Sequence, residues 1–252
     1  VDTGSDATDA PVDTGSDASD AGTDAPADTG SDAPADTGSD ATGDASTDSG
    51  TKPSNLVIAE VYGGGGNNAP YDHDFIVLFN KGSAPVSLAG LFIQYGSASG
   101  NFNGTGSNAV ALPSVSVNPG QYYLIQGATS GSTSTTPLPT PDFNAGFNMS
   151  LSDGKVALVF GAPLNGCGAA GNACPTASIV DLVGYGSASQ FEGSAAAPAL
   201  SIQNSGARKQ HGCQDTDQNA NDFTAAAPTP KNTSSPLNNC ALQDGGTGGT
   251  GG

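Results

Sequence analysis

The segments NLVIAEVY (residues 55–62) and DFIVLFN (residues 74–80) decide the fold class of this 252-residue chain. Both have the length of a strand and are rich in β-branched and aromatic residues, and glycine-containing segments follow each of them. In the first segment, Val57, Ala59 and Val61 alternate with other residues, so we expect them on one face of a sheet. The two segments therefore predict β-strands.

Further segments of strand length follow along the chain. The pattern predicts strands over residues 86–95, near 109–112, and over 121–126, 155–160 and 178–185. Asn118-Pro119-Gly120 has the composition of a turn, because proline fixes φ and glycine adopts positive φ without strain. No segment shows a helical period with caps. The sequence thus predicts an all-β, immunoglobulin-like sandwich with one core and long Gly/Ser/Asn loops.

Composition divides the chain into three parts. The first fifty residues contain only Val, Asp, Thr, Gly, Ser, Ala and Pro, with 13 of the 24 acidic residues and no Lys or Arg. Such a segment cannot bury apolar surface, and its like charges repel one another. We therefore expect a disordered acidic stalk over residues 1–52, the sandwich over 53–240 and a flexible Gly/Thr-rich tail over 241–252.

The charge argues against two classes of partner. Most of the formal net charge of −18 belongs to the stalk, and residues 51–240 carry 10 acidic and 6 basic residues, or about −4. The basic residues are scattered, so neither nucleic acid nor an anionic membrane surface is expected as a partner. No apolar segment is long enough to insert into a membrane.

Four cysteines lie in the second half of the chain: Cys167, Cys174, Cys213 and Cys240. An even number in a chain of this composition indicates disulfides formed in an oxidising compartment. Zinc is the alternative, but the spacing is not typical of a zinc site and the two histidines do not complete one. We expect Cys167 to pair with Cys174, and Cys213 with Cys240.

Several motifs resemble parts of catalytic sites, but none is complete. Asp-Thr-Gly-Ser recurs at Asp2, Asp13, Asp28 and Asp36 and matches the loop of aspartic proteases. That chemistry needs two aspartates in a rigid buried dyad, which a disordered repeat does not hold. The glycines of 63–66 lack the helix and the lysine of a phosphate-binding loop.

Other hydrolytic chemistry also lacks its partners. Only His73 and His211 could act as an imidazole base, and nothing in the sequence pairs Glu60, Asp181 or Glu192 as the carboxylates of a glycosidase. The sequence therefore predicts no enzyme and no cofactor.

One segment concentrates ligands for a hard cation: Asp215, Asp217, Asn219 and Asp222. The alternation of carboxylate and amide oxygens is typical of calcium loops, although the turning glycine and the bidentate glutamate of an EF-hand are missing. The alternative is that these side chains accept hydrogen bonds from local backbone amides or pair with Arg208 and Lys209. The sequence leaves calcium binding and this structural role as two hypotheses.

The strands, in this order, followed by GCQDTDQNANDFTAAAPTPKN (residues 212–232), resemble a bacterial lamin tail domain over roughly residues 54–233. Two positions depart from the pattern: Val77 stands where an acidic residue is usual, and Leu91 stands where tryptophan is usual. The resemblance implies an immunoglobulin-like sandwich without enzymatic activity. It also implies an accessory module of secreted or surface proteins, often found beside nucleases or phosphatases.

Together these features predict a non-catalytic binding or structural module, extracellular or on a bacterial surface, displayed on its stalk. A lipid anchor on a residue before Val1 would suit this display, and the partner would be an extracellular polymer or protein. The alternative is an accessory domain of a larger secreted hydrolase, a nuclease or phosphatase, whose catalytic domain lies outside this chain.

Overall fold

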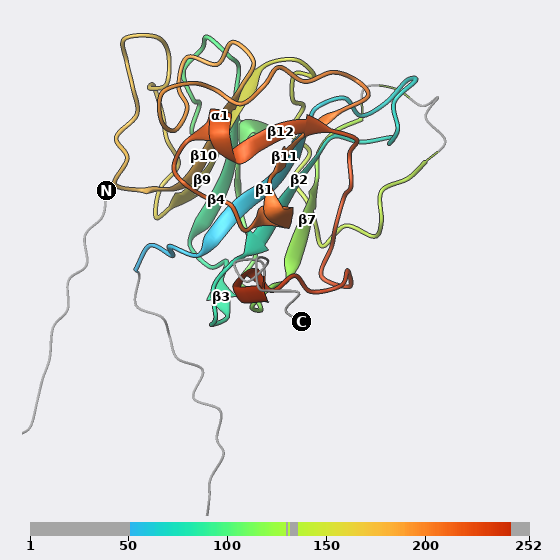
Figure 1. Ribbon diagram of the computed structural model, residues 1–252. Coiled ribbons are helices and arrows are strands. Elements are labelled where there is room, and N and C mark those ends of the chain that lie inside the picture. The colour runs from blue at the N-terminus through green and yellow to red at the C-terminus, as the bar shows by residue number, and fades with distance from the viewer. Residues whose placement is uncertain (1–50, 130, 132–135, 243–252) are drawn as a thin grey trace, which may run out of the picture. The chain divides into compact units, whose positions relative to one another are not determined.

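The computed structural model describes residues 51–129, 131 and 136–242 (Figure 1). The stalk expected over residues 1–52 and the tail expected over 241–252 lie outside the described residues, apart from two residues of each. The described part is built from strands, as the sequence predicts, with one four-residue α-helix and three short 3₁₀ helices.

The strands form two main sheets and a small third one. The six-stranded sheet has the order β12-β11-β1-β2-β7-β8, the four-stranded sheet β10-β9-β4-β5, and β3 pairs with β6. Neighbouring strands are antiparallel except β7 and β8. Their bounds are β1 Leu56–Tyr62, β2 Phe75–Asn80, β3 Val86–Ser87, β4 Leu91–Gly96, β5 Ala109–Ala111, β6 Ser116–Val117, β7 Tyr122–Gln126, β8 Phe143–Asn144, β9 Gly154–Phe160, β10 Ile179–Tyr185, β11 Ser205–Arg208 and β12 Phe223–Ala226. The helices are η1 Gly106–Asn108, η2 Gln210–Gly212, α1 Asn219–Asp222 and η3 Cys240–Leu242.

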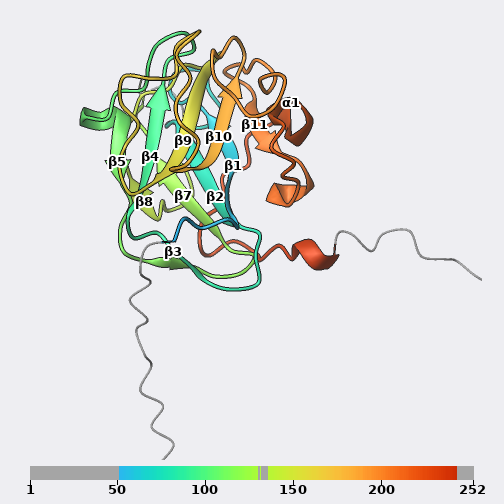
Figure 2. The same cartoon turned by 90° about the vertical axis from the view of Figure 1, so that its left-hand side faces the viewer.

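The two main sheets pack face to face and enclose the principal core (Figure 2). Ile58, Ile76 and Ile125 contribute to this core from the six-stranded sheet, and Ile93 and Leu158 contribute from the four-stranded sheet. Burial of branched aliphatic side chains between two sheets is the main stabilising contribution in such a sandwich. The predicted all-β, immunoglobulin-like sandwich is therefore confirmed.

The outer face of the six-stranded sheet is also covered. Val57, Phe79 and Tyr122 form a second buried cluster there, and the half-buried Cys213 and Cys240 pack against it. In Figure 1 the red C-terminal segment runs from β12 down past β7 to the end of the sandwich near β3. The sequence after β11 thus covers a face that a strictly two-layered sandwich exposes to solvent.

The first strand differs from the alternation that its sequence predicts. Val57 and Ala59 lie in the outer cluster, but Val61 lies in the principal core. The register between β1 and β2 shifts between Ile58 and Glu60, which marks a β-bulge. Because one inserted residue reverses the faces of everything after it, the expectation that all three residues share a face is wrong for Val61.

The segment predicted as one strand over residues 86–95 is broken. It forms β3 and β4, with a turn between them at Gly90, whose φ is +75°. Glycine adopts this conformation without strain. The segment before the turn pairs with β6, and the segment after it pairs with β5 and β9. Leu88 stays buried in the principal core between the two strands.

The glycines of 63–66 form a packed connection and not a loose loop. All four are buried, and a Cβ on Gly65 would lie 2.0 Å from the carbonyl carbon of His73. The buried carboxylate of Asp74 fixes this connection, because it accepts hydrogen bonds from the amides of Gly65 at 2.9 Å and Met149 at 2.8 Å. The glycines permit close approach of two backbones.

Both disulfides have the pairing that the sequence predicts. Cys167 pairs with Cys174 across seven residues, and Cys213 pairs with Cys240 across 27 residues. The second bridge holds the C-terminal segment against the outer cluster of the six-stranded sheet. Among the described helices, none has the length and apolar character needed to cross a membrane.

Candidate functional site

A buried arginine lies at the centre of the most highly charged part of the described structure. Arg208 ends β11, and its side chain is fully buried beside β1. Its Nε donates to the carbonyl of Ile58 at 2.9 Å, next to the bulge of β1. Its Nη2 donates to Asp181 Oδ2 at 2.6 Å, and its Nη1 donates to Asp215 Oδ1 at 2.8 Å. The guanidinium thus connects β1, β10 and the loop after η2.

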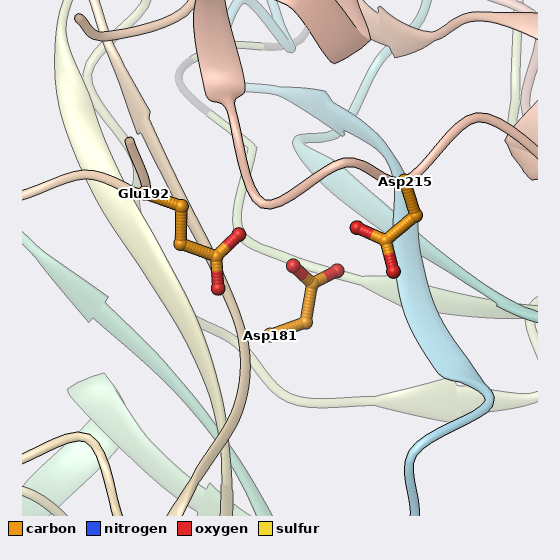
Figure 3. Close-up of side chains that lie close together, drawn as sticks. All are labelled: Asp181, Glu192 and Asp215. Atoms are coloured by element: carbon orange, nitrogen blue, oxygen red, sulfur yellow. The ribbon is translucent and has the colours of Figure 1, made fainter. Parts of the chain in front are cut away.

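Three carboxyl groups converge beside this guanidinium. Asp181, Glu192 and Asp215 each place a carboxylate oxygen within 4.8 Å of the other two, and within the described residues they form the only such group of acidic, histidine or cysteine side chains. Figure 3 shows the three carboxyl groups turned toward one another. Asp181 also accepts a hydrogen bond from the amide of Ile58, and Glu192 Oε1 accepts one from the amide of Leu182 at 3.1 Å.

The pairing of Asp181 with Glu192 corrects the sequence analysis, in which nothing brought these residues together. Residues 181 and 192 belong to β10 and to the loop after it, and the chain folds back so that their carboxyl groups meet. Glu60 stays apart from them. Its buried carboxylate accepts hydrogen bonds from the hydroxyl of Ser205 at 2.6 Å and the amide of Thr229 at 2.8 Å, which hold the C-terminal segment.

The charges of this cluster do not balance. Asp181, Glu192 and Asp215, with Asp222 3.7 Å from the guanidinium, are four acids that face Arg208 and Lys81. Burial, together with the nearby charge of Asp181, raises the pKa of Glu192 to about 9. Burial opposes ionisation of Asp215 too, but Arg208 and Lys81 outweigh it and lower the pKa of that carboxyl group.

The proton is held by Glu192 at neutral pH. Burial raises the pKa of Asp181 as well, yet this carboxylate accepts hydrogen bonds from both Arg208 and the amide of Ile58. Those two donors favour its charged form, whereas Glu192 accepts one main-chain hydrogen bond and a longer contact of 3.5 Å from Asn219. A carboxylic acid therefore lies beside a carboxylate that is paired with arginine.

Glu192 also reaches a groove on the surface. The groove has a volume of about 390 Å³ and lies between β10, the loop at 190–193 and the segment before β1. Val180, Leu182 and Phe191 line it with apolar surface, and Glu192 and Asp217 supply its acidic groups. Of the charged cluster around Arg208, Glu192 is the member that lines this groove.

The edge of β10 beside this groove is covered by side chains, and further along it Gly184 and Gly186 bond to the main chain of Ala197. The amide of Gly184 donates to Asn219 Oδ1 at 2.8 Å, and Asn219 Nδ2 donates to the carbonyl of Leu182 at 2.9 Å. With the bond from the amide of Leu182 to Glu192, these contacts occupy backbone groups that an added strand would need. A partner would thus meet side chains at this edge.

The four residues predicted to bind calcium do different things. Asn219 faces β10, as described above, and Asp215 pairs with Arg208 and Lys81. Asp222 accepts hydrogen bonds from the amides of Thr216 at 2.8 Å and Gln218 at 3.2 Å, which is the capping role of the alternative hypothesis. Asp217 is exposed and has φ of +53°. Calcium binding stays one of the two hypotheses from the sequence, and an ion would have to compete with these contacts.

A serine and a lysine that the sequence analysis missed lie together elsewhere. Lys155 is fully buried, and its ammonium group donates to Ser189 Oγ at 3.0 Å, to the carbonyl of Gly100 at 2.6 Å and to that of Ala98 at 3.1 Å. Such a pair could act as nucleophile and base only if the amine had a free lone pair. Three acceptors satisfy all three N–H groups, so the lysine fixes two loops. In the sequence, the sign of this contact was a lysine within a strand of apolar residues.

The two histidines do not form part of a triad. His73 Nδ1 lies 2.8 Å from Asp72 Oδ1, and the main-chain oxygen of His211 accepts a hydrogen bond from the hydroxyl of Tyr122. Among the described residues, no hydrogen bond joins either imidazole to a serine or threonine hydroxyl. The arrangement of nucleophile, base and orienting acid is thus missing from this part of the chain.

Comparison with known proteins adds a family. The model of the family described as "Lamin Tail Domain" matches residues 49–186. Asp181 lies inside the matched residues, and Glu192, Arg208 and Asp215 follow them. No curated protein matches the chain. A similar solved structure is the crystal structure of a DUF4876 family protein from Bacteroides thetaiotaomicron, with 13% identity, coverage of 73% of this chain and 74% of that chain, and a TM-score of 0.48.

Proposed function

Since the chain belongs to the lamin tail domain family, we propose that its domain is a non-catalytic binding or structural module that works outside the cell. The observation that carries this proposal is the pairing of all four cysteines in two disulfides. Disulfides form and persist in oxidising compartments, and they are rare where thiols are kept reduced. The second of them holds the segment that covers the outer face of the six-stranded sheet.

The distribution of polar groups supports a role in binding. Buried ionisable groups such as Arg208, Asp181 and Glu60 are used to tie segments of the fold together. The two histidines have no nucleophile among their described partners. A module of this kind acts by presenting surfaces to another molecule, and the acidic composition of residues 1–50 suits a solvated stalk that would hold the module away from its attachment.

The proposal is tested with the full 252-residue chain in its oxidised form. We expect the chain to be retained on cell-envelope polymers or proteins, such as peptidoglycan or an immobilised envelope extract, without turnover. Parallel assays measure hydrolysis of DNA and of p-nitrophenyl phosphate. Turnover that follows the purified chain through two columns would contradict the non-catalytic role, and failure to bind any envelope fraction would contradict the binding role.

A further inference from the structure

The groove beside Glu192 combines two kinds of surface. It is lined by the apolar side chains of Val180, Leu182 and Phe191 and by the carboxyl groups of Glu192 and Asp217. Its volume of about 390 Å³ is in the range of sites that bind small molecules or a few residues of a peptide. A ligand that fits both surfaces must therefore have an apolar body and a polar or charged end.

The charge around the groove specifies the sign of that end. With Asp217 included, five carboxyl groups surround this part of the domain. Glu192 is neutral, so four carboxylates face Arg208 and Lys81, and Lys52 lies at the rim of the groove. Asp217 has no hydrogen bond or ion pair with any described residue, although it lines the groove. Opposite charge at the open side of such a cluster is favoured by Coulomb attraction.

The chain itself places an ammonium group at the rim of this groove. Lys52 lines it, and its Nζ donates to the carbonyl of Ile179 at 2.7 Å. The lysine belongs to the segment before β1 and is exposed, so its ammonium group reaches the groove from outside. This contact shows that the rim offers a main-chain acceptor to a lysine side chain as well as the two carboxyl groups.

From these observations we propose that the groove binds a lysine side chain presented by a partner protein. The four methylene groups of the lysine pack against Val180, Leu182 and Phe191, the ammonium group pairs with the carboxylate of Asp217, and it donates a hydrogen bond to an oxygen of the neutral Glu192 side chain. Lysine suits such a site because its stem is apolar and its head is a compact charge. Since the edge of β10 is closed by Glu192 and Asn219, the partner contributes side chains and not an added strand. The inference rests on the proposed role as a binding module.

The test uses the full oxidised chain, labelled with ¹⁵N, and the peptide acetyl-Gly-Gly-Lys-Gly-Gly-amide. We expect concentration-dependent shifts of the backbone amides of Val180, Phe191 and Gly193. A peptide with norleucine in place of lysine keeps the stem without the charge and should leave these amides unchanged. In Asp217→Asn the affinity should fall about five-fold, the range of an exposed ion pair. Asparagine is suited to the positive φ of this position.

Two further variants separate the groove from general attraction by an acidic protein. Glu192→Gln keeps a neutral group with an oxygen that accepts the bond from Leu182, as the protonated carboxyl group does, so at pH 7 it should change the affinity far less than Asp217→Asn does. Asp72→Asn removes a partly exposed carboxylate that does not line the groove, so it should have no effect. Folding of each variant is checked by the dispersion of the remaining amide signals.

The proposal is overturned by an absence of shifts, by equal shifts with the norleucine peptide, or by equal loss of affinity in Asp72→Asn. It is also overturned if the matching arginine peptide binds more tightly, or if calcium chloride shifts these amides and the lysine peptide does not. None of these results touches the retention of the chain on envelope material, so the proposed function can stand when the lysine site fails.

Discussion

Arg208 Nη2 and Asp181 Oδ2 lie 2.6 Å apart in the interior of the domain, with both side chains almost fully buried. This ion pair joins β11 to β10, which belong to different sheets. The same guanidinium donates a hydrogen bond to the carbonyl of Ile58 at the bulge of β1. A hydrogen-bonded charge pair in this position fixes how the two sheets meet, and it leaves an uncompensated charge when either partner is removed.

The first prediction concerns this arginine. Replacing it by methionine, Arg208→Met, keeps an apolar stem but leaves Asp181 and Asp215 without their buried cation. We expect the free energy of unfolding to fall by about 3–5 kcal/mol. Urea denaturation measures this value, and Lys209→Met serves as the control. Lys209 is exposed, so its replacement should change stability by less than about 0.5 kcal/mol. Equal effects of the two substitutions would show that the buried pair has no special role.

The second prediction concerns the pH dependence that Glu192 imposes. Burial raises the pKa of its carboxyl group from the ordinary value of 4.5 to about 9 in the folded chain, so the folded state holds an extra proton between these values. The stability that this proton provides is present at pH 5 and is lost as pH rises toward 9. Glu192→Gln imitates the protonated form and should remove this loss.

Between pH 5 and pH 9 the free energy of unfolding of the wild type should therefore fall by roughly 1–3 kcal/mol relative to that of Glu192→Gln. One pKa unit corresponds to about 1.4 kcal/mol, and the partial exposure of the carboxyl group reduces the effect. Chemical denaturation at the two pH values measures the difference. If the difference in free energy of unfolding between variant and wild type were the same at both pH values, Glu192 would not hold the extra proton. Asp72→Asn controls for loss of one negative charge.

How far the sequence predicts this structure differs between its parts. The strands with alternating or continuous apolar residues, such as β2, β7, β9 and β10, follow from their composition alone. The strands β11 (SGAR) and β12 (FTAA) carry too few apolar residues for such a pattern. The pairing of β11 with β1, and of β12 with β11, makes them strands. The bulge in β1 also depends on tertiary contacts, because Arg208 and Asp181 bind its backbone at Ile58.

The candidate site was accessible to sequence reasoning only in part. The acidic segment after Cys213 was recognised as a concentration of ligands, but its separate contacts could not be foreseen, because Asn219 faces a strand 37 residues earlier. Likewise, Asp181 and Glu192 meet through the fold and not through a motif. The signal that was available is the isolated charge of Asp181 inside an otherwise apolar strand, which needs a buried partner.

The third prediction concerns the disulfides. Loop-closure entropy indicates a loss of about 3–4 kcal/mol when the 27-residue loop is opened in Cys213→Ser/Cys240→Ser, and about 2 kcal/mol for the seven-residue loop in Cys167→Ser/Cys174→Ser. The longer bridge also holds the segment that covers Tyr122. Thermal melting of both double variants compares them. If Cys167→Ser/Cys174→Ser lost more stability than Cys213→Ser/Cys240→Ser, the bridge to the C-terminal segment would not be the more stabilising one.

The fourth prediction concerns the glycine connection. A Cβ on Gly65 meets the backbone at His73 and Asp74, which cannot move aside cheaply. Gly65→Ala should therefore reduce the free energy of unfolding by about 2 kcal/mol or more, the range of overpacking in a core. Gly104→Ala is the control, since its nearest contact is 3.2 Å away and it lies near the surface. Equal stability of the two variants would mean that the connection is loose.

The fifth prediction concerns calcium. Asn219, Asp215 and Asp222 already have protein partners, so we expect the same melting midpoint in calcium and in chelator. An ion that binds only the folded state would raise the midpoint by mass action. A rise in calcium that is lost in Asp217→Ala would establish the calcium site that the sequence suggests and would replace the capping role. A rise that survives this substitution would place the ion elsewhere.

The most direct test of a role outside the cell is the redox state of the four cysteines in the protein as its own host makes it. Free thiols are blocked with an alkylating reagent at the moment of lysis or harvest, and the protein is then digested and mapped by mass spectrometry. The account predicts no alkylated cysteine, with Cys167 linked to Cys174 and Cys213 linked to Cys240. Alkylation of most of the protein at these positions would mean that it resides in a reducing compartment, and would contradict the account.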